Sequence, residues 1–273
     1  MSNSGRILLV GFGNMGQALV RGWLDSGRAA ANVRVVEPAA SARGVARDLG
    51  VAASDSVASA LAGFRPDVVV LAVKPNQIGS ALGECSAVAG ATTVWLSIAA
   101  GKTIAALSAG LGAKAAVVRA MPNTPAAIGK GMTALVANAA VTAEQRALCT
   151  DLMAAVGAVA WLDDERHMDA VTAVSGSGPA YVFLLIECLE RAALDLGLAP
   201  ELARQLALAT VSGAATYAAV ADAAPAELRR RVTSPNGTTQ AALEVLMADD
   251  GLSALLTRAV RAAAARSREL SAA

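Results

Sequence analysis

The stretch ILLVGFGNMG at residues 7–16 decides the fold. Its four apolar residues, 7–10, are typical of a short buried strand, and Gly11, Gly13 and Gly16 follow in the spacing GxGxxG just before a helical pattern. Gly11 would allow a tight turn, Gly13 would let the backbone approach a pyrophosphate, and Gly16 would let helix and strand pack closely. The stretch therefore predicts a dinucleotide-binding βαβ unit, with a glycine-rich turn that holds no ligand as the alternative.

Outward from this unit, apolar runs alternate with helical patterns as far as residue 161. The expected strands are 7–10, 33–36, 68–73, 94–98 and 116–118, followed by a strand, a helix at 142–156 and a strand within 131–161. The expected helices at 15–26 and 39–49 end before Gly27 and Gly50, where glycine can adopt a left-handed conformation. This alternation predicts an α/β domain, residues 1–162, with a doubly wound, mostly parallel sheet.

The second half, residues 163–273, carries only helical patterns. The expected helices are 168–196, 200–220, 226–231, 239–247 and 252–270. Their faces carry more alanine and leucine than a small lone bundle can hide, which predicts an all-α domain that dimerises with a second copy. The most apolar stretch, 171–196, is interrupted by a proline and four charged residues, so we expect a buried helix of a soluble protein, with no membrane span.

Composition and net charge limit the class of ligand that we expect. Lysine and arginine number 23 against 22 acidic residues, a formal net charge of +1, so no overall field attracts nucleic acid or an anionic membrane, and a small molecule is favoured. Three cysteines without a CxxC pair and a single histidine argue against a disulfide framework and a metal site. This cysteine usage fits a reducing cytoplasm, where we expect the protein. The N-terminus lacks the apolar region and cleavage site of a secretory signal, so we expect no targeting peptide.

Two charged residues follow expected strands at the edge where such sheets bind ligands. Glu37 ends the second strand, 21 residues after Gly16, where a carboxylate can accept hydrogen bonds from the adenosine ribose and repel a 2′-phosphate. It predicts a preference for NADH over NADPH; a solvated glutamate near Arg43 is the alternative. Lys74 follows the strand at 68–73, where it is expected to face the ligand; a surface lysine is the alternative.

Six motifs in order resemble the pyrroline-5-carboxylate reductase family over nearly the whole chain. They are GFGNMG at 11–16, AVKP at 72–75, SIAAG at 97–101, AMPNTPA at 120–126, AVSGSGPAYVF at 173–183 and VTSPNGTT at 232–239. The resemblance implies a Rossmann domain, a helical dimerisation domain, and homodimers that often assemble into larger rings such as a decamer. It also implies reduction of 1-pyrroline-5-carboxylate to L-proline, the last step of proline biosynthesis, with NADH or NADPH.

The resemblance also implies site residues. The cofactor contacts would be Gly11, Phe12, Gly13, Asn14, Met15, Gly16, Ala72, Val73, Lys74, Pro75, Ser97 and Ala99, with Ala99 near the nicotinamide. The substrate contacts would be Glu165, Ser177, Gly178, Ser234, Gly237, Thr238 and Thr239. In this family the serine hydroxyl and backbone amides of the SPNGTT-like loop hold the substrate carboxylate, and the threonine matching Thr239 bonds the ring nitrogen as the catalytic residue. The SGSGPA segment, 175–180, would form a further wall.

The chain departs from the family pattern at Asn236, where glycine is usual. Asparagine tolerates positive φ, so we expect the loop to keep its shape. Glu37 stands where NADPH-preferring relatives carry a small hydroxyl residue, which supports an NADH preference. A protonated cyclic imine is already electrophilic and needs positioning more than an acid, so a site of serine, threonine and backbone amides suffices.

Three other functions are alternatives to reduction of 1-pyrroline-5-carboxylate. The β-hydroxyacid dehydrogenases share this layout but need a lysine general acid or base on the interdomain helix, and no lysine follows Lys130. A non-catalytic dinucleotide-sensing protein of the same fold stays open, as does a reductase of another cyclic imine.

Overall fold

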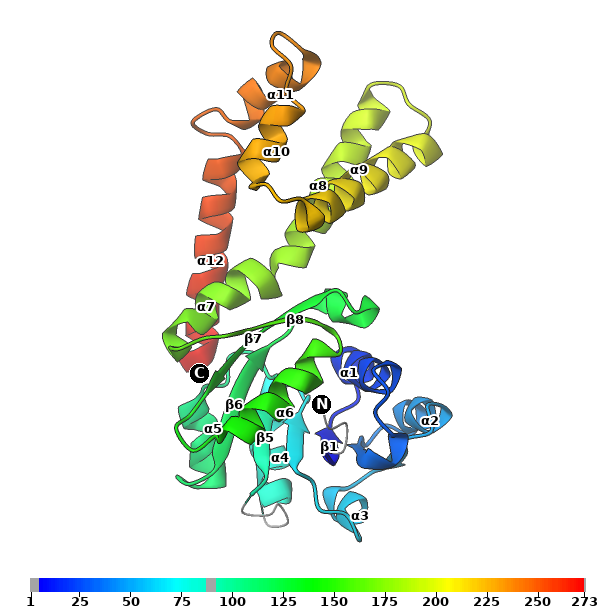
Figure 1. The fold of residues 1–273 in the computed structure, drawn as a ribbon, viewed down its shortest axis with the longest axis vertical. Helices are drawn as coiled ribbons and strands as arrows, with labels where there is room; N and C mark the ends of the chain where they lie inside the picture. The colour runs from blue at the N-terminus through cyan, green and yellow to red at the C-terminus, as the bar shows by residue number, and fades with distance from the viewer. Residues whose placement is uncertain (1–4, 87–91, 273) are drawn as a thin grey trace. The chain divides into compact units, whose positions relative to one another are not determined.

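The computed structural model describes residues 5–86 and 92–272. The chain forms two compact units, one of Met1–Gly176 with Ala263–Ala273 and the other of Ser177–Ala262. In its described part, the first unit holds an eight-stranded sheet in the order β3-β2-β1-β4-β5-β6-β7-β8 (Figure 1). The strands are β1 Ile7–Val10, β2 Val33–Val36, β3 Ala52–Ser54, β4 Val68–Leu71, β5 Val94–Ser97, β6 Ala116–Met121, β7 Gly131–Ala137 and β8 Gly157–Trp161.

Neighbouring strands are parallel throughout the sheet except for the antiparallel pair β6 and β7. The helices of this unit include α1 Asn14–Asp25, α2 Ala40–Asp48, α3 Val57–Leu61, α4 Ile78–Ser86, α5 Ile104–Leu111 and α6 Ala143–Ala154. The glycines expected after the first two helices adopt the predicted left-handed conformation: Gly27 follows α1 with φ of 87°, and Gly50 follows α2 with φ of 77°. The predicted doubly wound, mostly parallel sheet is therefore confirmed.

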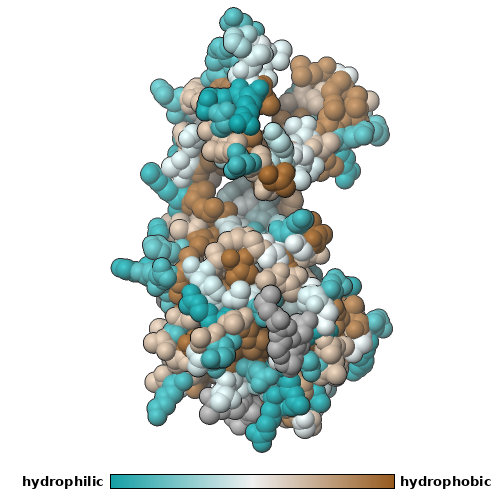
Figure 2. Space-filling model, viewed as in Figure 1, coloured by the Kyte–Doolittle hydropathy of each residue, from teal (hydrophilic) through white to brown (hydrophobic). Residues whose placement is uncertain are grey.

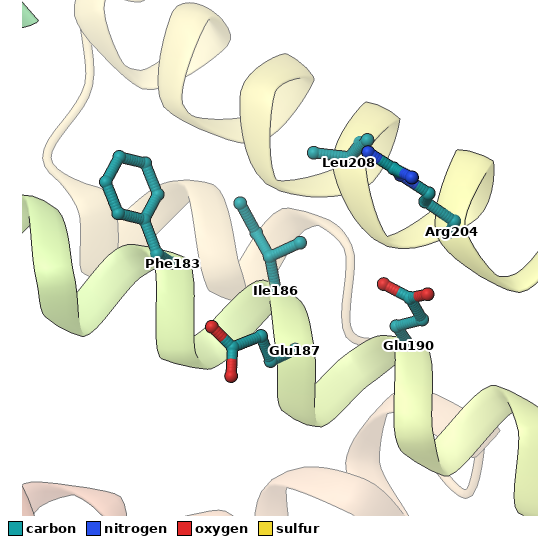
Figure 3. Close-up of a pocket in the computed structure, with 6 residues that line it drawn as sticks. All are labelled: Phe183, Ile186, Glu187, Glu190, Arg204 and Leu208. Atoms are coloured by element: carbon teal, nitrogen blue, oxygen red, sulfur yellow. The ribbon is translucent and has the colours of Figure 1, made fainter.

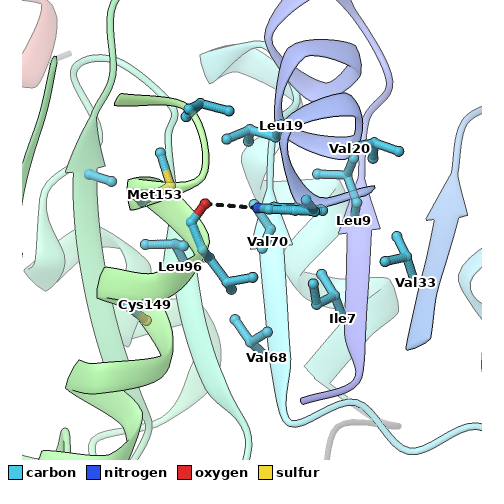
Figure 4. Close-up of a cluster of buried hydrophobic side chains, with 14 of the residues drawn as sticks. Ile7, Leu9, Leu19, Val20, Val33, Val68, Val70, Leu96, Cys149 and Met153 are labelled. Carbon is cyan, nitrogen blue, oxygen red and sulfur yellow. Dashed lines mark hydrogen bonds between the residues drawn. The ribbon is translucent and has the colours of Figure 1, made fainter. Parts of the chain in front are cut away.

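The sheet is buried on both faces. Ile7 and Leu9 of β1 point into one apolar cluster, and Leu8 points into the other, so nearly continuous apolar strands have no solvated side. The first cluster is drawn in Figure 4, where a dashed line marks the hydrogen bond from Trp23 Nε1 to the carbonyl of Leu152, 2.8 Å long. This bond satisfies the indole N–H inside the core and ties α1 to α6.

Some strand bounds differ from the expectation. β3 was not predicted, because Ala52–Ser54 is short and lacks an apolar run, and its pairing with β2 makes it a strand. β6 continues past Val118 to Met121, because its last residues pair with β7. β4 ends at Leu71 and β5 at Ser97, before the residues expected to end them.

The second unit is helical. Its elements are α8 Gly178–Asp195, α9 Pro200–Val220, α10 Pro225–Arg231, α11 Thr238–Leu246 and the beginning of α12 Leu252–Ala272. The single helix expected at 168–196 is wrong: the chain forms α7 Met168–Val171, a π-helix at Thr172–Gly176, and only then α8. Gly176 and Gly178 weaken a continuous helix there, and Pro179 fits the first turn of a new one.

The two units divide after Gly176, later than residue 162. The segment from Glu165 onward makes hydrogen bonds to the sheet domain, from Arg119 to Glu165 and from Asn123 to Ser175. The end of α12 also belongs to the first unit, where Ser267 Oγ donates to Asp169 Oδ1 at 2.6 Å. The predicted boundary at 162 marks where the strands end, and as a domain boundary it stays a prediction.

The most apolar helix is not buried within the single chain. By length and composition alone, the helical stretch Glu165–Asp195 could cross a membrane, and only 6% of its most apolar window is buried. None of the residues of α8 is buried, and Phe183 and Leu206 are among the exposed large apolar residues. Figure 2 shows brown, hydrophobic surface on the helical part, at the top of the view. The single chain therefore does not provide the expected burial of this helix, and its cover by a second copy, which the apolar faces predicted, stays a prediction.

Candidate active site

The turn between β1 and α1 has the geometry that its glycines predict. Gly11 has φ of 96°, and a Cβ there would lie 2.7 Å from the carbonyl oxygen of Ala72. A Cβ on Gly16 would lie 2.6 Å from the carbonyl oxygen of Gly11. Gly13, by contrast, has nothing within 4 Å of its Cβ position, so its backbone is open to a ligand at the beginning of α1.

A cavity of about 690 Å³ opens at the carboxyl ends of β1, β2 and β4. Of the predicted cofactor residues, seven line it: Gly11, Phe12, Gly13, Glu37, Ala72, Val73 and Lys74. The other predicted residues are not part of its lining: Asn14, Met15, Gly16, Pro75, Ser97 and Ala99. The cavity has the size of a typical small-ligand site and lies where open α/β sheets bind ligands.

The Glu37 carboxylate accepts a hydrogen bond from the glycine-rich turn, and the sequence did not predict this bond. Its Oε2 accepts a hydrogen bond from the N–H of Phe12, and its Oε1 accepts one from the N–H of Ala39, both at 2.9 Å. Arg43, the expected counter-charge, instead donates to the backbone carbonyls of Glu37 and Pro38 at 2.8 and 2.6 Å. A carboxylate has about four acceptor positions, so Glu37 retains capacity for a ribose hydroxyl.

The charged residues that line this cavity are mostly acidic. Besides Glu37, the carboxylates of Asp55 and Glu84 contribute to it, and Lys74 is the basic residue among its lining. Asp55 and Glu84 come from segments that sequence reasoning did not connect with the cofactor. Three carboxylates around one cavity disfavour a dianionic phosphate more than a neutral hydroxyl.

Glu165 is held by a buried arginine. Its Oε1 accepts hydrogen bonds from Arg119 Nη1 at 2.8 Å and from the N–H of Ile104 at 2.9 Å. The Arg119 side chain is 5% exposed and that of Glu165 is 28% exposed. Arg119 was missed, although a charge within the apolar run of β6 was a signal for a buried ion pair.

The SPNGTT loop precedes an uncapped helix. Asn236 has φ of 57°, which confirms the prediction that asparagine adopts the left-handed conformation there. The N–H of Gly237 donates to the carbonyl of Ser234 at 3.1 Å, and a side chain on Gly237 would collide with Ser234 Oγ. No side-chain oxygen caps α11, so the N–H groups at Thr238 and Thr239 can receive a carboxylate.

The predicted substrate residues divide between the two units. Glu165 lies in the first unit, while the other six lie in the second: Ser177, Gly178, Ser234, Gly237, Thr238 and Thr239. Ser177 and Gly178 begin α8 directly after the π-helix. The structure therefore describes each part of the predicted substrate site within its own unit.

A smaller cavity of about 260 Å³ lies between α8 and α9. Phe183, Ile186, Glu187 and Glu190 of α8 and Arg204 and Leu208 of α9 line it, as Figure 3 shows. None of the predicted site residues contributes to this cavity, so it is not part of the candidate active site.

Two cysteines are unsuited to nucleophilic catalysis. Burial raises the pKa of the Cys85 thiol to about 12, with a smaller contribution from Glu84. Burial likewise raises the pKa of Cys149 to about 12. Both thiols therefore stay protonated at neutral pH, and the thiolate is the reactive form.

Comparison with known proteins connects these features. Residues 165–270 match the family model for pyrroline-5-carboxylate reductase dimerisation, and residues 6–101 match that for NADP oxidoreductase, coenzyme F420-dependent. The pyrroline-5-carboxylate reductase of Pseudomonas aeruginosa is 46% identical, with 97% of this chain and 96% of that protein covered. That of Corynebacterium melassecola is 40% identical, with 97% and 98% covered.

Solved structures agree with these relatives. The pyrroline-5-carboxylate reductase structure from Coxiella burnetii has a TM-score of 0.93 at 36% identity, with 98% of this chain and 99% of that chain covered. The Plasmodium falciparum pyrroline carboxylate reductase with NADP bound has a TM-score of 0.86 at 28% identity, with 99% and 100% covered. With a dinucleotide-type cavity, a matched dimerisation domain and relatives of this identity over nearly its full length, the chain belongs to the pyrroline-5-carboxylate reductase family.

Proposed function

We propose that this protein reduces 1-pyrroline-5-carboxylate to L-proline with a reduced nicotinamide cofactor, in the last step of proline biosynthesis. The observation that carries the proposal is the 46% identity to a pyrroline-5-carboxylate reductase over 97% of the chain. The cavity at the strand ends, with the open backbone at Gly13, fits a dinucleotide. The uncapped beginning of α11 fits the carboxylate of the substrate.

The proposed chemistry requires orientation more than acid catalysis. When bound, the nicotinamide supplies a hydride to the carbon of the protonated imine, whose π electrons move onto nitrogen to give the amine. Ser234 and the N–H groups of Thr238 and Thr239 hold the carboxylate, aided by the positive end of the α11 dipole. The Thr239 hydroxyl accepts a hydrogen bond from the ring N–H, and Glu165 favours the iminium charge. Each group fixes the ring relative to the hydride donor.

We also propose that NADH is preferred over NADPH. The support is the acidic cavity lining, in which Glu37, Asp55 and Glu84 outnumber Lys74. A 2′-phosphate would add negative charge beside these carboxylates, whereas a 2′-hydroxyl could donate to Glu37.

We propose that the active form is a homodimer, with a larger ring of dimers as the alternative assembly. The matched dimerisation domain and the exposed apolar side chains of α8 and α9 support the dimer. A cytoplasmic location is proposed because Cys85, Cys149 and Cys188 are all free, as expected in a reducing compartment.

Oxidation of NADH and of NADPH by the purified protein, with and without 1-pyrroline-5-carboxylate, tests these proposals. Substrate-dependent oxidation is expected with both cofactors and should be faster with NADH. Faster turnover with NADPH would retain the reaction and reject the argument from the acidic lining. Binding of a cofactor without turnover would reject the proposed substrate and favour a sensor or a reductase of another cyclic imine.

A further inference from the structure

Asn123 makes hydrogen bonds to two segments that are far apart in the sequence. It follows β6 and stands at the N-cap of a short 3₁₀ helix, Thr124–Ile128, yet its side chain does not cap that helix. Its Oδ1 accepts a hydrogen bond from the N–H of Met132 at 2.8 Å. Its Nδ2 lies 3.2 Å from the carbonyl oxygen of Ser175 and 3.3 Å from Ser175 Oγ, and donates to both. An asparagine that forgoes local capping to join distant segments has a fixed orientation.

The segment that Asn123 contacts is the π-helix, Thr172–Gly176. π-helical turns are rare, because they depart from the regular α-helical bonding pattern, and they occur frequently at functional sites. The methyl group of Met121 lies against Gly176, so a Cβ on Gly176 would collide with it. Ser175 and Gly176 are therefore held from the sheet side by two neighbouring residues, Asn123 through hydrogen bonds and Met121 through packing.

We propose that Asn123 is a positioning residue for substrate binding, because its side-chain amide holds the π-helix in the conformation that presents Ser175 and Gly176 to the imino acid. The inference rests on the proposed function and on the implication of the family resemblance that the SGSGPA segment, 175–180, forms a wall of the substrate pocket. The residues that line the proposed cofactor cavity do not include Asn123 or any residue of the π-helix. Loss of the Asn123–Ser175 bonds should therefore weaken binding of the imino acid and leave binding of the cofactor unchanged.

Asn123→Asp removes the hydrogen-bond donor of this side chain and keeps its acceptor. The carboxylate still accepts from Met132 N–H, but it cannot donate to Ser175. The KM for 1-pyrroline-5-carboxylate is expected to rise about tenfold, as for loss of one to two hydrogen bonds, with a much smaller change in kcat and in the KM for NADH. A KM for the imino acid equal to that of the wild type would overturn the proposal.

Asn138 offers a matched control in the same sheet. Its Oδ1 accepts from the N–H of Val117 at 3.1 Å, and its Nδ2 donates to the carbonyl of Ala115 at 2.8 Å. Asn138→Asp thus loses a similar structural bond at the far end of the strand pair and should leave the KM for the imino acid unchanged. Equal increases in the two variants would mean that Asn123 acts only on stability, and would reject a positioning role.

A second variant covers the case in which Asn123→Asp does not fold. Gly176→Ala disturbs the same segment from the Met121 side, and the same selective rise in the KM for the imino acid is expected. Adding Met121→Ala should reverse part of this rise, because it removes the colliding methyl group. An unchanged KM in Gly176→Ala would reject the proposal. A wild-type protein that does not reduce 1-pyrroline-5-carboxylate would reject the proposed function itself, and this inference with it.

Discussion

The Nη1 atom of Arg119 lies 2.8 Å from Oε1 of Glu165, and the same oxygen accepts the N–H of Ile104 at 2.9 Å. Both bonds therefore use one carboxylate oxygen, and Oε2 takes no part in them. This arrangement connects β6, the beginning of α5 and the segment that leads to the π-helix. In the proposed site, where Glu165 contacts the imino acid, these bonds to Oε1 would fix the orientation of Oε2 toward the iminium ion.

Arg119→Met is expected to destabilise the protein and to raise the KM for the imino acid. Breaking a buried ion pair on one side costs about 3–5 kcal/mol when the remaining charge is fully buried. Because Glu165 retains 28% exposure, we expect about 2–3 kcal/mol, measured as the free energy of unfolding in urea. Arg119→Lys keeps the charge and should recover part of the loss. Equal stability and equal KM in Arg119→Met and the wild type would contradict the role given to this pair.

Thr239→Ala is expected to lower kcat/KM for 1-pyrroline-5-carboxylate by roughly ten- to hundredfold. The proposed hydrogen bond to a charged ring nitrogen is worth ~1.5–3 kcal/mol. Thr239→Ser keeps the hydroxyl and should retain most of the activity. Thr257→Ala is the control, because the Thr257 hydroxyl donates only to the carbonyl of Ser253 within α12. If Thr239→Ala and Thr257→Ala have the same kcat/KM, Thr239 has no part in the reaction.

Glu37→Ser is expected to shift cofactor use toward NADPH. Removing one of the three carboxylates in the cavity lining should raise the ratio of kcat/KM for NADPH to that for NADH by about tenfold. The variant also loses the acceptor for the N–H groups of Phe12 and Ala39, so a loss of about 1–2 kcal/mol in unfolding free energy should accompany it. Glu37→Gln removes the charge but keeps one of the two acceptor oxygens, so it separates loss of the charge from loss of the whole side chain. A ratio that stays constant in both variants would refute the assignment.

The predictable part of the molecule was that in which local pattern and tertiary structure agree. The GxGxxG turn, the buried strands and the helix at 200–220 follow from glycine spacing, apolar runs and a proline in the first turn, and they lie where expected apart from the ends of β4, β5 and β6. β3 and the π-helix did not follow, because strand pairing in the first and contacts from Asn123 and Met121 in the second determine them.

The residues of the candidate site also divide into those that could be predicted from the sequence and those that could not. Sequence reasoning gave Glu37 from its spacing after the GxGxxG turn, and Glu165 and the SPNGTT loop from the family resemblance. It could not give Arg119, Asp55 or Glu84, whose importance depends on which segments the sheet brings together. The excess of apolar surface in the helical half predicted a second copy, but a single sequence does not show that no residue of α8 is buried by its own chain.

Replacing glycine by alanine should impair cofactor binding at Gly11 and raise stability at Gly44, because only Gly11 needs a conformation and a space that alanine does not fit. In Gly11→Ala, the methyl group would lie 2.7 Å from the Ala72 carbonyl oxygen at φ of 96°, so the turn must distort, and the KM for NADH should rise at least about tenfold. In Gly44→Ala, within α2, nothing lies within 4 Å of the new methyl group, so the helix should gain about 0.5–1 kcal/mol in unfolding free energy. Urea denaturation and the KM for NADH, measured on both variants, check the pair. A Gly11→Ala variant with normal cofactor affinity would show that the turn can rearrange without disturbing the cofactor cavity, and the requirement for glycine there would be withdrawn.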